Sequence, residues 1–195
     1  YALIRYRVIV ELQWLVTLAE TPEIKEIPPF SAKTKDYIHR FIHEFNVDHA
    51  MRVKSIEAEI NHDVKAVEYY LRESFADADE LKSYLEFIHF ACTSEDINNL
   101  AYALMIGDGL KITFTSMEHL LQSLRDLAHA TAGNAMLSRT HGQAATPTTM
   151  GKELANTVYR LERQLSLLRN VPLFGKMNGA VGNYNAHTVA YPEID

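Results

Sequence analysis

Cysteine is almost absent from this sequence of 195 residues. Cys92 is the single example, so no disulfide can form within the chain, and a lone thiol fits a reducing compartment. No apolar run approaches the roughly 20 residues that a membrane-spanning helix needs, and no secretory signal pattern follows Tyr1. We therefore expect a cytoplasmic protein without a membrane partner.

An excess of basic residues is also lacking. Lysine and arginine number 19 against 25 aspartates and glutamates, which gives a net charge of −6. Nucleic-acid-binding proteins usually carry a basic surface, so nucleic acid is not an expected partner. A small anionic substrate is still compatible with this charge, because a site can be locally positive within an acidic protein.

Glycine does not occur before Gly107, and the alternating Val/Ile stretches typical of β-strands are missing. Apolar residues recur instead every three or four positions, which indicates amphipathic helices. We expect an all-α fold, with a proline-broken connection over residues 21–31. The expected helices of the first half cover residues 1–20, 33–45, a segment capped by Asp48 that runs to about Ile60, and a segment that Asn61 opens.

The second half predicts long bundle helices. Apolar positions alternate spacings of three and four, as along the seam of a coiled coil. Gly107 and Gly109 are expected to interrupt the first of these helices. We expect a small helical domain over residues 1–90 and the start of a long-helix bundle over residues 91–195. The seam positions are Met117, Leu120, Leu124, Leu127 and Thr131, then Leu154, Val158, Leu161, Leu165 and Leu168.

Two polar segments interrupt the helical pattern before residue 100. Asn61, His62 and Asp63 form the first, where Asn61 and Asp63 can be explained as helix-capping residues but His62 is harder to explain in that way. Thr93 and Ser94 begin the second, and two hydroxyls at a helix N-terminus also suit an anionic ligand. The second segment also includes His89, but a histidine between apolar neighbours is more often a core residue.

A third polar segment, "SRTHGQAATP", separates the two seam helices. Gly142 and Pro147 predict a short hairpin or loop, with Thr148 or Thr149 capping the helix that follows. Thr140 and His141 lie at the turn rather than on an apolar stripe. An imidazole can hold or release a proton near neutral pH, so His141 is a candidate functional residue, although a surface histidine would give the same pattern.

A fourth segment, "GKMNGAVGNYNAH", is rich in glycine and asparagine and includes Lys176 and Asn178. Its backbone is suited to lie against a ligand, although an ordinary connection between helices is about equally consistent with it. His39 and His43 have the spacing of a metal-binding pair, but no glutamate or cysteine cluster accompanies them. We expect a solvent-facing helix there and no metal.

Three of these segments together resemble the fumarase/aspartase superfamily: "TSEDINNLAYALM", "SRTHGQAATPTTMGKELANTVYRLERQ" and "GKMNGAVGNYNAH", in this order. Within it, "NHDVKAVEYYL" and "FIHFACTSEDINN" are similar to the adenylosuccinate lyase family. Ala144 stands where that family usually has proline. The resemblance covers nearly the whole chain and implies long bundle helices, a homotetramer with sites shared between subunits, and no metal or organic cofactor.

The resemblance also implies a reaction and roles. Fumarate would be eliminated from adenylosuccinate, giving AMP, and from the succinyl-carboxamide ribotide of purine biosynthesis. His141 would be the general acid. Substrate would be bound by Asn61, His62, Asp63, Thr93 and Ser94, with His89, Thr140, Lys176 and Asn178 in support.

The family's serine-bearing signature loop and its C-terminal helical domain do not occur in this sequence. Both ends of the sequence look cut, so we expect a fragment that is inactive by itself. Two alternatives remain. The first is another fumarate-releasing lyase such as argininosuccinate lyase or fumarase, although "THGQ" with Gly142 favours the purine enzyme. The second is a non-catalytic helical oligomerisation module, which the seam alone would permit.

Overall fold

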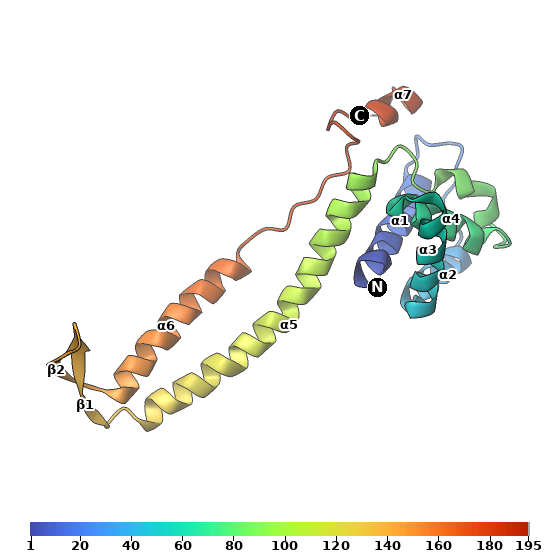
Figure 1. The fold of residues 1–195 in the computed structure, drawn as a ribbon. Helices are drawn as coiled ribbons and strands as arrows, with labels where there is room; N and C mark the ends of the chain where they lie inside the picture. Colours follow the sequence, from blue (N-terminus) through green and yellow to red (C-terminus); the bar gives the residue numbers. More distant parts are fainter. Residues whose placement is uncertain (195) are drawn as a thin grey trace. The chain divides into compact units, whose positions relative to one another are not determined.

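A computed structural model describes residues 1–194 of the chain as two compact units (Figure 1). The first unit contains residues 1–106 and 174–194, and the second contains residues 107–173. The expected all-α class is confirmed, since helices dominate and the described part has a single two-stranded sheet. No helix within it is long and apolar enough to cross a membrane. The domain boundary expected at residue 90 stays a prediction.

The first unit is built from short helices around one apolar core. In Figure 1, α1 in blue is followed by α2, α3 and α4, and α1 packs against all three. The apolar faces expected from the spacing are buried, with Leu12, Ile38, Leu71 and Phe75 exposed by 1% or less. Its elements are α1 (Ala2–Glu20), α2 (Ala32–Glu44), α3 (Val47–Ile60), α4 (Asp63–Phe75), the 3-10 helix η1 (Leu81–Phe87), the start of α5 (Ser94–Ala130) and α7 (Asn185–Ala190).

Two helix starts differ from the sequence prediction. Asn46, not Asp48, caps α3, because its side chain accepts the backbone N–H groups of Asp48 and His49. Asn61 does not open α4 but ends α3, with a φ of 56° in the left-handed region that asparagine tolerates. His62 is therefore the residue that caps α4.

The expected interruption of α5 at Gly107 and Gly109 is wrong, because this helix is continuous from Ser94 to Ala130. A glycine inside a helix costs only about 1 kcal/mol relative to alanine. The helix formers on both sides of the two glycines, such as Leu104, Met105 and Lys111, outweigh that cost. The unit boundary falls within this helix.

The second unit pairs the later part of α5 with α6 (Met150–Arg169). Its core is formed by Leu121, Val158 and Leu165 with four partly buried neighbours: Phe114, Met117, Leu124 and Leu161. Val158 and Leu165 are buried and Leu161 is partly buried, as the predicted seam requires on α6, but Leu168 at its end is 39% exposed. On α5 the prediction was partly wrong, because Leu120 and Leu127 are 46% and 49% exposed and Leu121 is buried instead.

A β-hairpin joins the two helices, with β1 (Ala135–Thr140) antiparallel to β2 (Gln143–Thr149). Its turn contains His141 at φ 53° and Gly142 at φ 76°, the two positive values of a tight type I′ turn. Thr149 caps α6 by accepting the backbone N–H of Lys152 at 3.1 Å. The expected hairpin is thus confirmed, and of the two candidate caps for this helix, Thr148 and Thr149, it is Thr149 that caps it.

Candidate active site

Arg7 of α1 connects two of the predicted site segments. Its guanidinium donates to Asp63 Oδ2 at 2.6 Å and to Asn98 Oδ1 at 2.9 Å, and the side chain is almost fully buried. The segment 61–63 is thereby brought beside the first turns of α5. Partial burial acts to raise the pKa of Asp63, but the Arg7 guanidinium outweighs it and holds that pKa below its usual value. Asp63 is therefore a fixed, ionised group.

His62 has a structural role that the sequence did not reveal. Its Nδ1 accepts the backbone N–H of Lys65 at 3.1 Å and so caps α4. An Nδ1 that accepts a hydrogen bond carries no proton, so a neutral His62 has its proton on Nε2 and can donate it. A hollow of about 550 Å³ adjoins this exposed ring, and its lining consists of Lys54, Glu57, Ala58, Asn61, His62 and Asp63.

Thr93 and Ser94 lie at the N-terminus of α5, as expected. The first backbone N–H groups of a helix have no partner within it, and the helix dipole favours negative charge at this end. The neighbouring Asp96 occupies one of the backbone donors at this end, since its carboxylate accepts the backbone N–H of Thr93 at 2.9 Å. The two residues are partly exposed, and a hydroxyl can donate to an anionic group.

Asp96 also fixes the glycine-rich loop against α5. Its Oδ1 accepts from Lys176 Nζ at 2.8 Å and from the backbone N–H of Asn178 at 3.1 Å, and its side chain is fully buried. Burial acts to raise its pKa, but Lys176 and the backbone donors lower it below the usual value. Asn99 completes the attachment, because its side-chain amide bonds both the N–H and the carbonyl of Lys176.

His89 is partly buried, and its Nδ1 lies 2.7 Å from Glu11 Oε1. Its φ is 62°, in the left-handed region, and it precedes Thr93 by four residues. The structure thus gives His89 a side-chain partner and a place next to the segment that enters α5.

The structure therefore brings together three of the four predicted segments: residues 61–63, residues 93–94 and the loop with Lys176 and Asn178. The fourth carries Thr140 and His141 and belongs to the second unit. There His141 occupies the exposed hairpin turn, as its position in the sequence predicted.

Sequence reasoning missed Arg7 and did not single out Asp96 as a site residue. Asp96 follows a threonine by three residues, which is the spacing of a capping box, and that local signal hid its longer contacts. Arg7 has no local signal at all, because its partners are 56 and 91 residues away. Among residues 1–194, no group of three or more His, Cys, Asp and Glu side chains is placed to hold a metal ion.

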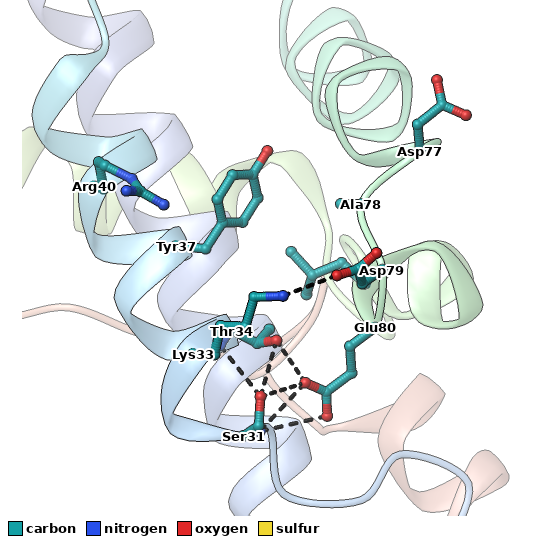
Figure 2. Close-up of a pocket in the computed structure, with 10 residues that line it drawn as sticks. Ser31, Lys33, Thr34, Tyr37, Arg40, Asp77, Ala78, Asp79 and Glu80 are labelled. Carbon is teal, nitrogen blue, oxygen red and sulfur yellow. Dashed lines mark hydrogen bonds and ion pairs between the residues drawn. The ribbon is translucent and has the colours of Figure 1, made fainter.

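A separate hollow of about 480 Å³ lies at the start of α2 and contains none of the predicted site residues (Figure 2). Two of its three acidic side chains, Asp79 and Glu80, already have partners within the chain. Glu80 accepts from Ser31 Oγ at 2.8 Å and from Thr34 Oγ1, and Asp79 pairs with Lys33 at 3.0 Å. These contacts fasten the N-terminus of α2 to the loop before η1, so the polar side chains that make them have a structural role.

Comparison with known proteins shows which family the chain belongs to. A family model described as "Lyase" matches residues 2–194. The chain is 50% identical to proteins named adenylosuccinate lyase from Escherichia coli K12 and Vibrio cholerae, over 100% of this chain and 43% of each relative. A relative with the same name from Buchnera aphidicola of Schizaphis graminum is 44% identical over the same shares. The chain thus spans less than half the length of these relatives.

Solved structures show the same fold at low sequence identity. A fumarate lyase from Mesorhizobium sp. BNC1 matches with a TM-score of 0.76 at 21% identity, over 97% of this chain and 43% of that one. A β-carboxy-cis,cis-muconate cycloisomerase from Acinetobacter calcoaceticus matches with a TM-score of 0.73 at 21% identity, over the same shares. The family model and the 50% identical relatives confirm the predicted resemblance, and the chain belongs to the lyase family.

Proposed function

We propose that the chain is the N-terminal part of an adenylosuccinate lyase, which acts in purine biosynthesis in the cytoplasm. The observation that carries this proposal is the full-chain identity of 50% to relatives of that name, together with three predicted segments gathered at the N-terminus of α5. Its substrates are adenylosuccinate and the succinyl-carboxamide ribotide. No metal or organic cofactor takes part in the proposed reaction.

The proposed reaction breaks a carbon–nitrogen bond in the succinyl group. A base removes the proton from the carbon beside a carboxylate, the electron pair forms the double bond of fumarate, and the bond to nitrogen breaks. His141 then gives its proton to the departing nitrogen, as a general acid. Negative charge grows on the carboxylate as the proton leaves. Thr93 and Ser94 donate hydrogen bonds to it and stabilise the transition state more than the ground state.

Asn61, His62 and Asp63 bind the substrate in this proposal, beside the hollow that they line. His62 donates from Nε2, because its Nδ1 is occupied by the helix cap. Arg7 and Asp96 do not need to touch the substrate. They hold the segment 61–63 and the loop with Lys176 and Asn178 in register with α5.

The same proposal includes a homotetramer whose active sites combine residues from several subunits. Its support is the exposed apolar surface of the second unit, which a monomer would leave in water. Exposed fractions there are 72% for Ile112, 46% for Leu120, 61% for Tyr159 and 63% for Leu167. Contact between copies of this surface would bury these side chains.

The decisive assay uses the full-length protein and measures fumarate release from adenylosuccinate, argininosuccinate and malate in parallel. We expect release from adenylosuccinate alone. Preference for argininosuccinate or malate would instead support the other lyases of the superfamily. A protein that releases no fumarate, and whose melting temperature adenylosuccinate does not raise, would contradict the proposal and favour an oligomerisation module.

A further inference from the structure

Three polar side chains lie along one face of α1, each contacting a different part of the site. Arg7, Glu11 and Trp14 are four and three residues apart, so they share a helix face. Arg7 holds Asp63 and Asn98, as described above. Trp14 Nε1 donates to the backbone carbonyl of Phe90 at 2.8 Å. Glu11 lies between them, and the proposed reaction assigns it no role.

Glu11 is buried in a way that stability alone does not explain. Its side chain is 0% exposed and its Oε1 lies 2.7 Å from His89 Nδ1, while its buried Oε2 has no hydrogen-bond partner within the described residues. A buried carboxylate with an unpartnered oxygen is costly. Apolar residues of similar volume often stabilise a core as well as a buried ion pair does. The contact with His89 therefore points to a role other than core stability.

The segment that Glu11 contacts is strained. His89 and Ala91 have φ values of 62° and 58°, a region that costs an L-residue on the order of 1 kcal/mol or more. Such a conformation persists only where surrounding contacts hold it. Two of these contacts come from α1, through the side chain of His89 and the carbonyl of Phe90.

We propose that Glu11 is a positioning residue, which holds the His89 imidazole by its Nδ1 and thereby fixes the strained segment that leads into Thr93 and Ser94. The inference rests on the proposed function, since in that reaction the hydroxyls of Thr93 and Ser94 stabilise the negative charge on the substrate carboxylate. Glu11 acts through His89 and through the backbone, and it does not touch the substrate.

The pair also holds a proton. Burial acts to lower the pKa of His89, but the Glu11 carboxylate outweighs it and raises that pKa above its ordinary value. Burial raises the pKa of Glu11 itself. The other titratable groups facing the pair are Glu68 and Lys65 of α4 and the thiol of Cys92. The pair titrates as one unit, and it keeps its proton to a higher pH than an isolated histidine would.

The test compares Glu11→Gln with the parent full-length protein. Glutamine keeps the shape and the acceptor oxygen but removes the charge, so His89 should lose its proton at a lower pH. We expect kcat at pH 8 to fall on the order of tenfold, because the lost charge no longer raises the pKa of His89, with a change below about threefold at pH 6 and little change in KM. Glu68→Gln is the matched control, because Glu68 is also buried but pairs with Lys65 and Arg72. Its pH profile should shift less.

An unchanged pH profile in a folded Glu11→Gln protein would overturn the proposal. If that variant does not fold, Glu11→Asp replaces it, since aspartate keeps the charge but is too short for the 2.7 Å contact. A lowered kcat would then support the proposal and an unchanged one would refute it.

A second measurement needs no activity. A raised pKa for His89 means that the pair's contribution to folding is complete below about pH 6.5 and is lost as the pH rises through the folded value. The melting temperature of the parent protein, relative to Glu11→Gln, should therefore decline between pH 6 and pH 9. A constant difference would refute the pairing. A parent protein that shows this decline but releases no fumarate would contradict the proposed function and leave the pair intact.

Discussion

Ser94 is the first residue of α5, and its hydroxyl is one of the two donors assigned to the growing carboxylate charge. In the full-length protein we predict that Ser94→Ala lowers kcat roughly a hundredfold, about 3 kcal/mol of barrier, as loss of one such donor does elsewhere. Steady-state kinetics with adenylosuccinate measure the effect. Ser116→Ala, an exposed serine on the same helix, is the control. A raised KM with normal kcat would show that Ser94 binds substrate and transition state equally.

Asp96 joins the start of α5 to the glycine-rich loop, so its charge matters for stability. Replacing it with Asn removes the ion pair with Lys176, and we predict a loss of about 2 kcal/mol, typical of a hydrogen bond to a charged group. Glu95→Gln, in the same helical turn but exposed, should change stability much less. Urea unfolding of the full-length protein measures both variants.

The stabilisation by Asp96 also depends on pH in a defined direction. Its pKa is lower in the folded protein than the ordinary 3.8. Its contribution is therefore complete above that ordinary value and is lost as the pH falls through the folded value. The difference in unfolding free energy between the parent protein and Asp96→Asn should shrink in acid. A difference that grows there would contradict the assignment.

At the residue scale, the sequence predicted where the site residues lie in helices and turns better than which residues they contact. Thr93, Ser94 and His141 lie at the helix start and the turn where local signals place them. Asn61 was wrong as a cap because asparagine suits both ends of a helix, and only the backbone path decides between them. Arg7 was beyond prediction, since its contacts depend on how distant segments pack.

At the element scale, α6 begins in close contact with the end of α5. Gly151 is buried there, and a Cβ on it would lie 2.6 Å from the Cα of Ala132 and would also clash with the carbonyl oxygen of Ala128. Both obstacles are backbone, which cannot rotate away as a side chain would. Gly151→Ala should therefore destabilise this junction by about 3 kcal/mol, the upper part of the usual range for overpacking.

Gly133 offers the matched control for this substitution. It lies in the adjoining turn, where a Cβ would meet nothing within 4 Å. Thermal unfolding of the two alanine variants should separate them clearly. Equal melting temperatures would mean that α5 and α6 can move apart at the base of the hairpin without cost.

Helices and the hairpin were predictable as elements because their signals are local. Apolar spacing gave α1, α2, α4 and α6, and Gly142 with Pro147 gave the hairpin. The predicted break in α5 failed because the cost of two glycines is small against the length of the helix. The choice of Leu121 over Leu120 in the seam depends on the rotation of α5 toward α6, which spacing alone does not determine.

At the scale of the whole molecule, a protein made of these 195 residues alone should release no fumarate. The proposed general acid and substrate-binding residues are present, but the family's signature serine motif is not. A coupled assay with the purified 195-residue protein and the full-length protein tests this. Fumarate above background from the shorter protein would mean that the base lies within residues 1–195.

Sharing of sites between subunits predicts complementation. Full-length His141→Ala should be nearly inactive, and so should a variant without the signature serine. Hybrid tetramers formed by refolding the two together would contain sites with both parental residues, so a substantial fraction of activity should return. If mass measurement verifies the hybrid tetramers and activity still does not return, then either His141 and the serine come from one subunit or His141 is not the acid. Normal turnover by His141→Ala alone would exclude the acid role.

The polar face of α1 also has a consequence for synthesis on the ribosome. Arg7 and Glu11 are made before their partners Asp63, His89 and Asn98, which follow 56, 78 and 91 residues later. At about 5–20 residues per second, α1 waits roughly 5–20 seconds for the last of them. Until then its apolar stripe and these two charges lack the partners that cover them in the folded protein. Uncovered apolar surface of this kind is what chaperones bind, and this part of the site can close only after the start of α5 has left the exit tunnel.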